Sequence, residues 1–195
     1  MSTTVELAKY WLELGAVALD TETTGLRDHH EIIEVGVVDR GGDVLLQDLV
    51  VPTRAIPSDA TEVHGITNEY VVECGKIWAE VFTDLESIFE SRPVVIFNDV
   101  FDMRMITQTC DFHGVHDLDH ESIAVFDLMK LANRHLIDHA EWCTHNSRFK
   151  RLSLARCCEL MGVEFKGQAH RAVSDASAAM DLLQAIANSK PSGLN

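Results

Sequence analysis

A short apolar run that ends in two carboxylates, VALDTETTG at residues 17–25, constrains this chain more than any other stretch. In a β-strand, successive side chains alternate between the two faces, so Asp20 and Glu22 would share one face. Two neighbouring anions repel each other, and a divalent cation held by carboxylate oxygens removes that cost. An acid pair at a strand end is also common at solvated edges. Further ligands elsewhere in the chain are therefore needed before the pair indicates a metal site.

The length and composition are those of one well-buried core. The chain has 195 residues, 46% of them hydrophobic, which is too short for two ordinary domains. We expect a single domain over residues 1–195, with an N-terminal helix in 1–15, a core over about 16–187, and a frayed tail at 189–195. No apolar run reaches the roughly 18 residues of a membrane span, and residues 1–6 lack a signal peptide's basic start. Five cysteines without a Cys-x-x-Cys pair fit a reducing compartment, so we expect a cytoplasmic protein.

The charge distribution excludes a protein that coats long duplex nucleic acid. The net charge is −15, whereas neutralising phosphates requires a basic footprint. Residues 146–171 form a small basic island in which two acids, Glu159 and Glu164, accompany six cationic residues: Arg148, Lys150, Arg151, Arg156, Lys166 and Arg171. Such an island suits a short single strand, although ordinary surface residues would produce the same count.

The order of predicted elements indicates an α/β fold with a mixed sheet. A strand is expected at 17–23, and β-branched segments at 31–39 and 43–51, joined by Arg40-Gly41-Gly42, predict an antiparallel hairpin after it. Later strands are expected at 94–97 and 123–128, and loops at 110–122 and 139–150. Helices are expected at 4–14, from 58 to about 67, at 76–90, from 100, up to 136, and at 152–161 and 174–188. Three antiparallel strands followed by alternating helices and strands give a sheet flanked by helices.

Two further acids lie where helices are expected to begin. Asp102 follows the predicted buried strand 94–97 by one turn, so a compact sheet would bring it near the end of the first strand. Asp175 lies in the first turn of the last helix, five residues after His170. Each acid alone is explained by the favourable charge at a helix N-terminus.

Taken together, four segments resemble the DnaQ-like DEDDh exonucleases in order and spacing. They are Asp20 to Gly25 (DTETTG), Val63 to Thr67 (VHGIT), Asn98 to Asp102 (NDVFD) and His170 to Asp175 (HRAVSD). Residues 150–163 resemble the same family. The resemblance implies a ribonuclease H-like mixed five-stranded sheet. It also implies 3′-to-5′ hydrolysis that releases nucleoside 5′-monophosphates, as in the epsilon-type proofreading exonucleases of polymerase III.

The resemblance also implies a role for each motif residue. Two Mg²⁺ ions, for which Mn²⁺ can substitute, would act on the scissile phosphate. Asp20, Glu22 and Asp175 would hold one ion, and Asp20 would bridge to a second ion that Asp102 helps to hold. His170 would be the general base, and Arg171 stands where the related tyrosine branch has its tyrosine. The residues that would contact the terminal nucleotide are Thr23, His64 and Phe101; otherwise they are a strand-end hydroxyl, a helix-capping histidine and a core aromatic.

Two features depart from the family pattern. Asp99 stands where the family usually has alanine, and we expect it to cap the helix that follows; the alternative is that it enters the site. Histidines gather between 113 and 145, and the four-residue spacing of His135 and His139 would also suit zinc, with Cys143 and His145 nearby. No clean ligand pattern emerges there.

Three functions remain open from the sequence. The first is a single-stranded DNA 3′-exonuclease, with a DNA polymerase as partner if it proofreads. The second is an RNA-trimming enzyme of the ribonuclease T or oligoribonuclease type, and the third is a polymerase-docking module. All five catalytic positions are intact, which favours an enzyme, and we expect DNA rather than RNA as substrate. The motifs do not specify the oligomeric state.

Overall fold

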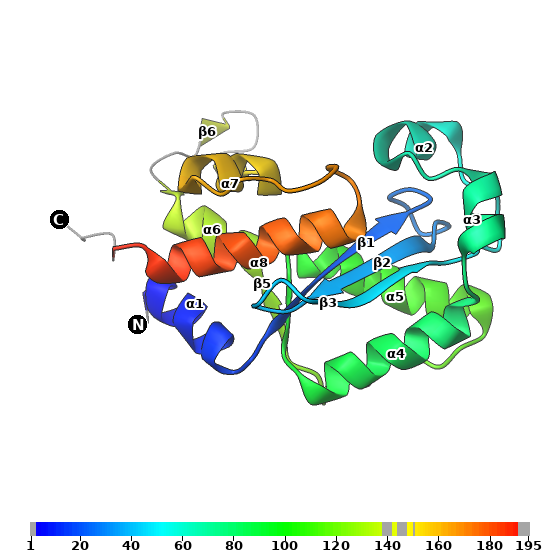
Figure 1. The fold of residues 1–195 in the computed structure, drawn as a ribbon, viewed down its shortest axis with the longest axis horizontal. Helices are drawn as coiled ribbons and strands as arrows, with labels where there is room; N and C mark the ends of the chain where they lie inside the picture. The colour runs from blue at the N-terminus through cyan, green and yellow to red at the C-terminus, as the bar shows by residue number, and fades with distance from the viewer. Residues whose placement is uncertain (1–2, 138–141, 144–147, 150, 191–195) are drawn as a thin grey trace.

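A five-stranded mixed sheet forms the centre of the molecule, with strands in the order β3-β2-β1-β4-β5 (Figure 1). The computed structural model describes residues 3–137, 142–143, 148–149 and 151–190. The strands are β1 (Val17–Thr23), β2 (Ile32–Val38), β3 (Val44–Leu49), β4 (Val94–Ile96) and β5 (Val125–Asp127). β1, β2 and β3 pair antiparallel, whereas β4 and β5 add parallel to β1. The predicted ribonuclease H-like α/β sheet is confirmed.

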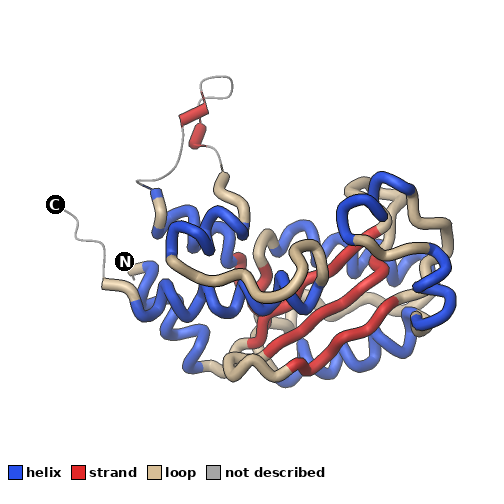
Figure 2. The backbone as a smooth tube through the Cα atoms, turned by 45° about the horizontal axis from the view of Figure 1, so that its top comes forward, coloured by secondary structure: helices blue, strands red, loops and turns tan. Residues whose placement is uncertain are grey.

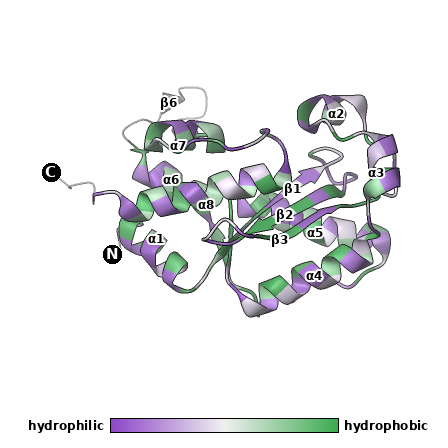
Figure 3. Cartoon of the chain, in the orientation of Figure 1, coloured by the Kyte–Doolittle hydropathy of each residue, from purple (hydrophilic) through white to green (hydrophobic). Residues whose placement is uncertain are grey.

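Helices cover both faces of this sheet (Figure 2). They are α1 (Thr4–Glu13), α2 (Ser58–His64), α3 (Asn68–Cys74), α4 (Trp78–Ser91), α5 (Asp99–His113), α6 (Leu128–His135), α7 (Leu154–Met161) and α8 (Ala172–Asn188). Side chains that alternate along β1 build the two main cores. Ala18 packs with α1, α6, α7 and α8 on one face, and Val17 and Leu19 pack with α4 and α5 on the other. Figure 3 shows the resulting bands of apolar and polar residues along α4.

The register of β1 and β2 brings the acidic strand end next to a second acid. Glu22 lies opposite Glu34, and Asp20 lies opposite Gly36. All seven residues of β2 are buried, including Glu34. The first turn of α8 packs on this part of β2 so closely that a methyl group at Gly36 would lie 2.4 Å from the backbone nitrogen of Val173. This contact fixes the start of α8 beside the acidic strand.

Some local predictions are wrong. Helix α3 was not expected; it begins at the N-cap Thr67, whose hydroxyl accepts a hydrogen bond from the backbone N–H of Tyr70. Residues 110–113 belong to α5 rather than to a loop, because Met105, Ile106 and Cys110 continue its buried face. Within the predicted loop 139–150, Trp142–Cys143 (β6) and Arg148–Phe149 (β7) pair as short antiparallel strands. The end of the predicted tail, 191–195, lies outside the described residues.

Among the residues that the structure describes, no helix is both long and apolar enough to cross a membrane.

Candidate active site

Two acids at the end of β1 and one in the first turn of α8 meet beside an exposed histidine. Asp20 and Glu22 are half-buried on the sheet face that α8 covers. Glu22, His170 and Asp175 each present a ligand atom within 4.8 Å of the other two. Asp102, in the first turn of α5, is buried, and its charge acts on Asp20. The fold thus brings together all five residues for which the sequence predicts a catalytic role.

Crowding and burial make the charged forms of these acids costly. Burial, followed by the charges of Asp102, Asp175 and Glu22, raises the pKa of Asp20 well above its ordinary value. Burial and the charge of Asp175 raise the pKa of Glu22 to about 8, and burial raises the pKa of Asp102 to about 7. Burial also raises the pKa of Asp175, against the opposing charge of His170. A proton or a bound cation would therefore relieve the repulsion among these carboxylate oxygens.

A buried hydroxyl orients Asp102, and this hydroxyl is not among the site residues predicted from the sequence. Thr21, between the two acids of β1, donates a 2.7 Å hydrogen bond from Oγ1 to Asp102 Oδ1. Thr21 is buried, as the alternation of β1 requires when Asp20 and Glu22 point the other way. This hydrogen bond opposes the effect of burial on the pKa of Asp102. The sequence signal for this role was a hydroxyl residue between the two acids of a predicted strand.

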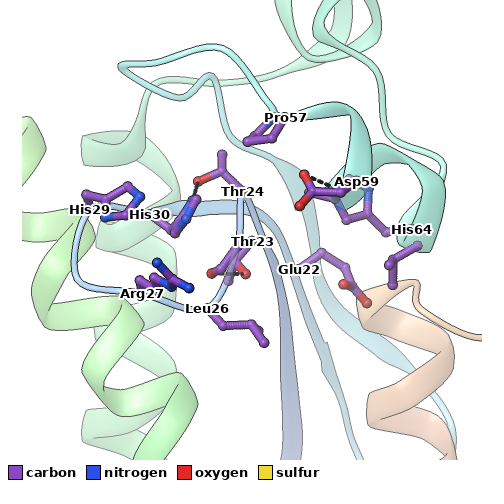
Figure 4. Close-up of a pocket in the computed structure, with 13 residues that line it drawn as sticks. Glu22, Thr23, Thr24, Leu26, Arg27, His29, His30, Pro57, Asp59 and His64 are labelled. Atoms are coloured by element: carbon purple, nitrogen blue, oxygen red, sulfur yellow. Dashed lines mark hydrogen bonds between the residues drawn. The ribbon is translucent and has the colours of Figure 1, made fainter.

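A pocket of about 670 Å³ adjoins Glu22 (Figure 4). Its wall is the loop after β1, and α2 with its N-cap Pro57 forms the opposite side, including Asp59 in the first turn and His64 at the end of the helix. Figure 4 shows Glu22 at the edge of the pocket beside the ribbon of α8, with His29 and His30 at the far side. A volume of this size is typical of small-ligand pockets. Asp59 is a pocket residue that is not among the site residues predicted from the sequence.

Helix α5 holds the loop that forms this wall. Arg104 Nη2 donates to the backbone oxygen of Leu26 at 2.9 Å, and Gln108 Nε2 donates to the backbone oxygens of Arg27, at 3.0 Å, and His30. Gly25 has a positive φ of 152°, and a Cβ there would lie 2.6 Å from the His30 ring. The loop therefore requires glycine at this position.

The three predicted nucleotide contacts lie in different surroundings. Thr23 and His64 line the pocket. The Thr23 hydroxyl donates to Gly25 O at 2.9 Å. Phe101 is not among the residues that line the pocket; it is half-buried at the start of α5, with the Arg104 guanidinium 5.6 Å from its ring centre.

His64 has a defined tautomer in this wall. The backbone N–H of Ile66 donates to His64 Nδ1 at 3.0 Å, so the ring proton belongs on Nε2. The residue is only 2% exposed, and Nε2 finds no hydrogen-bond partner among the described residues. Burial lowers the pKa of His64, which keeps the ring neutral. The pocket wall thus contains a neutral histidine whose Nε2–H makes no well-formed hydrogen bond with the described residues, although the Thr23 backbone partly opposes the effect of burial on its pKa.

The expected capping role of Asp99 is wrong. The N-cap position of α5 is Asn98, whose side chain makes no capping hydrogen bond. Asp99 instead lies against Asp127, which with burial raises the pKa of Asp99, and its Oδ1 lies 3.7 Å from Lys130 Nζ. Lys130 Nζ also lies 2.9 Å from Asp127 Oδ2, so its positive charge offsets the repulsion between the two carboxylates.

The histidines of 113–120 are occupied by separate acids. His113 contacts Glu31, while His116 and His120 contact Glu86 and Asp117 respectively. His135 bonds to the hydroxyls of Thr4 and Ser189. Of the other members of the zinc alternative, Cys143 belongs to β6, and His139 and His145 lie outside the described residues.

The basic island is partly neutralised. Arg156 pairs with Glu159, Lys166 with Asp181 at 2.9 Å, and Arg171 with Glu34. Arg151 is exposed, and Lys150 lies outside the described residues. Three of the six cations counted in the sequence therefore do not present a free positive surface.

Comparison with known proteins agrees with this fold. A family model described as an exonuclease, RNase_T, matches residues 17–183. The protein therefore belongs to the DnaQ-like exonucleases, a family of nucleases, and the predicted resemblance is confirmed.

Individual relatives agree with the family assignment. The uncharacterized exonuclease CP81 of Escherichia phage 186 is 34% identical over 95% of each chain. The DNA polymerase III subunit epsilon of Rickettsia felis is 29% identical, over 84% of this chain and 70% of the relative. E. coli exonuclease I, solved with a dT13 oligonucleotide, superposes with a TM-score of 0.65 at 17% identity. That match covers 84% of this chain but only 39% of exonuclease I.

The donor set fits a divalent cation. The converging atoms are carboxylate oxygens of Glu22 in β1 and Asp175 in α8, which are ordinary ligands for hard divalent ions, together with the imidazole of His170. The raised pKa values of Asp20, Glu22 and Asp102 express the charge repulsion that a bound cation would relieve. The residues present therefore suit the metal dependence expected of this family.

Proposed function

We propose that this protein is a metal-dependent 3′-to-5′ exonuclease that removes nucleoside 5′-monophosphates from the 3′ ends of single-stranded DNA, acting as one exonuclease domain. The observation that carries the proposal is the convergence of Glu22, Asp175 and His170 next to Asp20 and the 670 Å³ pocket. A site that binds an uncharged ligand does not require several partly buried carboxylates with raised pKa values.

The acids would divide between two cation positions. Asp20, Glu22 and Asp175 would hold one Mg²⁺, and Asp20 with Asp102 a second, with Mn²⁺ as a substitute. Two such ions would hold the scissile phosphate, lower the pKa of the attacking water and stabilise the leaving 3′ oxygen. The Thr21 hydrogen bond would keep Asp102 turned toward this position.

His170 would accept the proton of the attacking water. Its ring is exposed and lies within ligand distance of Glu22 and Asp175, so it can approach a water at the phosphate. The pocket beside Glu22 would receive the terminal nucleotide, with Thr23 in its wall. The free Nε2–H of His64 would donate to a phosphate or sugar oxygen there. Phe101 would contact the nucleotide only if its ring turned from its place beside Arg104.

The choice of DNA is supported by the relatives: exonuclease I was solved with an oligodeoxynucleotide, and epsilon is a subunit of a DNA polymerase. The epsilon likeness, which spans 84% of this chain, also favours proofreading beside a DNA polymerase as a second candidate. RNA trimming, the main alternative, would require the same pocket to accept a 2′-hydroxyl.

Direction and substrate can be tested together. Single-stranded DNA and RNA of one sequence, labelled at either the 5′ or the 3′ end, are incubated with the protein and Mg²⁺. We expect a 3′ label to leave as mononucleotide in the first turnover, a 5′ label to produce a descending ladder, and RNA to react more slowly. Asp20→Ala is the inactive variant. Asp99→Asn is the matched control, because Asp99 lies against Asp127 and Lys130 instead of in the site.

The outcomes are distinct. Survival of both substrates at high protein concentration would end the enzyme proposal. Faster digestion of RNA would establish the trimming alternative, and first release of the 5′ label would reverse the direction. For proofreading, the rate on a mismatched primer end is compared with and without a replicative DNA polymerase; no change on adding polymerase argues against docking.

A further inference from the structure

Glu34 is a buried charge that the proposed chemistry does not use. It lies in the middle of β2, is 2% exposed, and sits opposite Glu22 in the neighbouring strand. A buried carboxylate beside another acid is costly unless other groups compensate it. Its partners therefore indicate what it does.

Those partners all belong to the start of α8. Arg171 Nε donates to both Glu34 oxygens at 3.1 Å, and its Nη2 donates to Oε1. The backbone N–H of Ala172 donates to Oε2 at 2.9 Å. Arg171 is the N-cap residue of α8 but makes no capping bond with its own side chain. A carboxylate from another strand therefore caps this helix and binds its N-cap residue in a forked, charge-assisted contact.

The residue just before this contact is the proposed general base. His170 has a positive φ of 60°, one of two non-glycine residues in this state among the described residues. The left-handed conformation is unfavourable for a residue with a Cβ, so the surrounding contacts must impose it. On the far side of His170 the chain is exposed from Lys166 to Ala169. Before His170, Lys166 pairs with Asp181 at 2.9 Å, and the His170 backbone itself lies against the Asp175 carboxylate. Directly after His170, Arg171 and Ala172 are held on Glu34 and against Gly36.

We propose that Glu34 is a positioning residue for His170 and acts through Arg171. The pair Glu34–Arg171 holds the start of α8 on β2, so that the strained His170 backbone presents its ring to Glu22 and Asp175. The expected loss of activity rests on the proposed nuclease function, whereas the expected change in the position of the His170 ring does not. Because a fork of hydrogen bonds from Arg171 to Glu34 holds the start of α8, charge alone at position 171 is insufficient.

Three variants separate positioning from stability. Glu34→Gln removes the charge and sets an amide N–H₂ against the Arg171 and Ala172 donors. Arg171→Lys retains the charge and loses the fork. Glu31→Gln is the matched control: Glu31 is equally buried, but it bonds to Thr53, Arg54 and His113, away from α8. All are compared by thermal unfolding before they are assayed.

A double-mutant cycle with His170→Ala measures the coupling. We expect Glu34→Gln and Arg171→Lys to lower kcat by about 10- to 100-fold with little change in KM, as displaced catalytic groups do. In the His170→Ala background the same changes should cost less than about 2-fold, since the group they position is gone. Equal losses in both backgrounds would show that Glu34 acts on the fold or on the acids, and would overturn the inference.

A readout without turnover completes the test. The imidazole NMR signals of His170, assigned by their loss in His170→Ala, should move or broaden in Glu34→Gln and stay in place in Glu31→Gln. Unmoved signals would also overturn the inference. If the wild-type protein degrades neither DNA nor RNA, the proposed function fails, and the NMR comparison still decides whether Glu34 positions His170.

Discussion

Thr21 and Asp102, 81 positions apart in the sequence, are joined by a 2.7 Å hydrogen bond that crosses from β1 to α5. Both residues are buried, and the bond opposes the burial that raises the pKa of Asp102 to about 7. Thr21, which lies between Asp20 and Glu22 in β1, thus influences how readily Asp102 ionises.

Thr21→Val should therefore raise the pKa of Asp102 further. An acid must lose its proton to bind a cation, so the rising limb of the pH–activity profile should move to higher pH, with about a 10-fold loss near neutral pH. Rates at saturating Mg²⁺ between pH 6 and 9 test this. Thr21→Ser keeps the hydroxyl and should follow the wild type; an unshifted profile in Thr21→Val would contradict the role of the bond.

Asp20→Ala should lower the hydrolysis rate by about 1,000-fold or more, because it removes the ligand proposed to bridge both cations. The metal-free variant should unfold at a higher temperature than the metal-free wild type, since a repelling carboxylate is gone. Added Mg²⁺ should stabilise the wild type more than the variant. Calorimetric melting with EDTA or Mg²⁺ measures both effects, and equal stabilisation of the two proteins by Mg²⁺ would refute the ligand role.

Glu22→Gln should change how the stability of the metal-free protein depends on pH. The folded state holds the Glu22 proton up to about pH 8, against 4.5 ordinarily, so this contribution is present at low pH and disappears as pH rises through about 8. Relative to the variant, the wild type should lose roughly 2 to 4 kcal/mol between pH 5 and 9. Urea unfolding in EDTA measures the difference. The exposed Glu62→Gln is the control, and parallel curves for wild type and Glu22→Gln would contradict the raised pKa.

His64→Phe should weaken substrate binding more than turnover. The substitution roughly keeps the ring volume and removes both the Nε2–H of the pocket wall and the Nδ1 acceptor of the Ile66 N–H, so thermal unfolding is compared first. In the folded variant we expect KM for single-stranded DNA to rise about 10-fold with a smaller change in kcat. Steady-state kinetics measure the split. Val72→Ala, on an exposed face of α3, controls for nonspecific effects, and a loss confined to kcat would remove the binding role.

The salt dependence of activity should be shallow. Arg156, Lys166 and Arg171 are already paired with acids, so few cations remain to displace counterions from a single strand. We expect log kcat/KM to fall with log salt concentration at a slope of about −1 or smaller in magnitude. Arg151→Ala should reduce even this slope. A slope of about −4 would show that the ion pairs open on binding and that the whole basic island contacts the substrate.

The sheet and the acids were predictable because their signals are local. The alternation in 17–23 and the apolar run at 94–97 specify strands, and the family spacing places Asp102 and Asp175 at helix starts. The length of α5 was misread, since its polar end resembles a loop until Cys110 is seen packed in the core. The partners of Glu34 depend on which helix packs on β2, which no local pattern states. The sequence signal for the role of Glu34 was a charged residue and a glycine, Gly36, within the otherwise apolar strand 32–38.

Helix α5 carries Asp102 in its first turn and, two and six residues later, Arg104 and Gln108, which hold the loop after β1. One helix therefore positions both Asp102 and the wall of the pocket. Between residues 26–27 and His30, the main chain of Asp28 and His29 receives no hydrogen bond from α5; the Asp28 carboxylate pairs with Arg104, and His29 O accepts from Arg54. Substitutions at these two exposed positions would therefore change the loop beside the pocket without changing any of the five predicted catalytic residues.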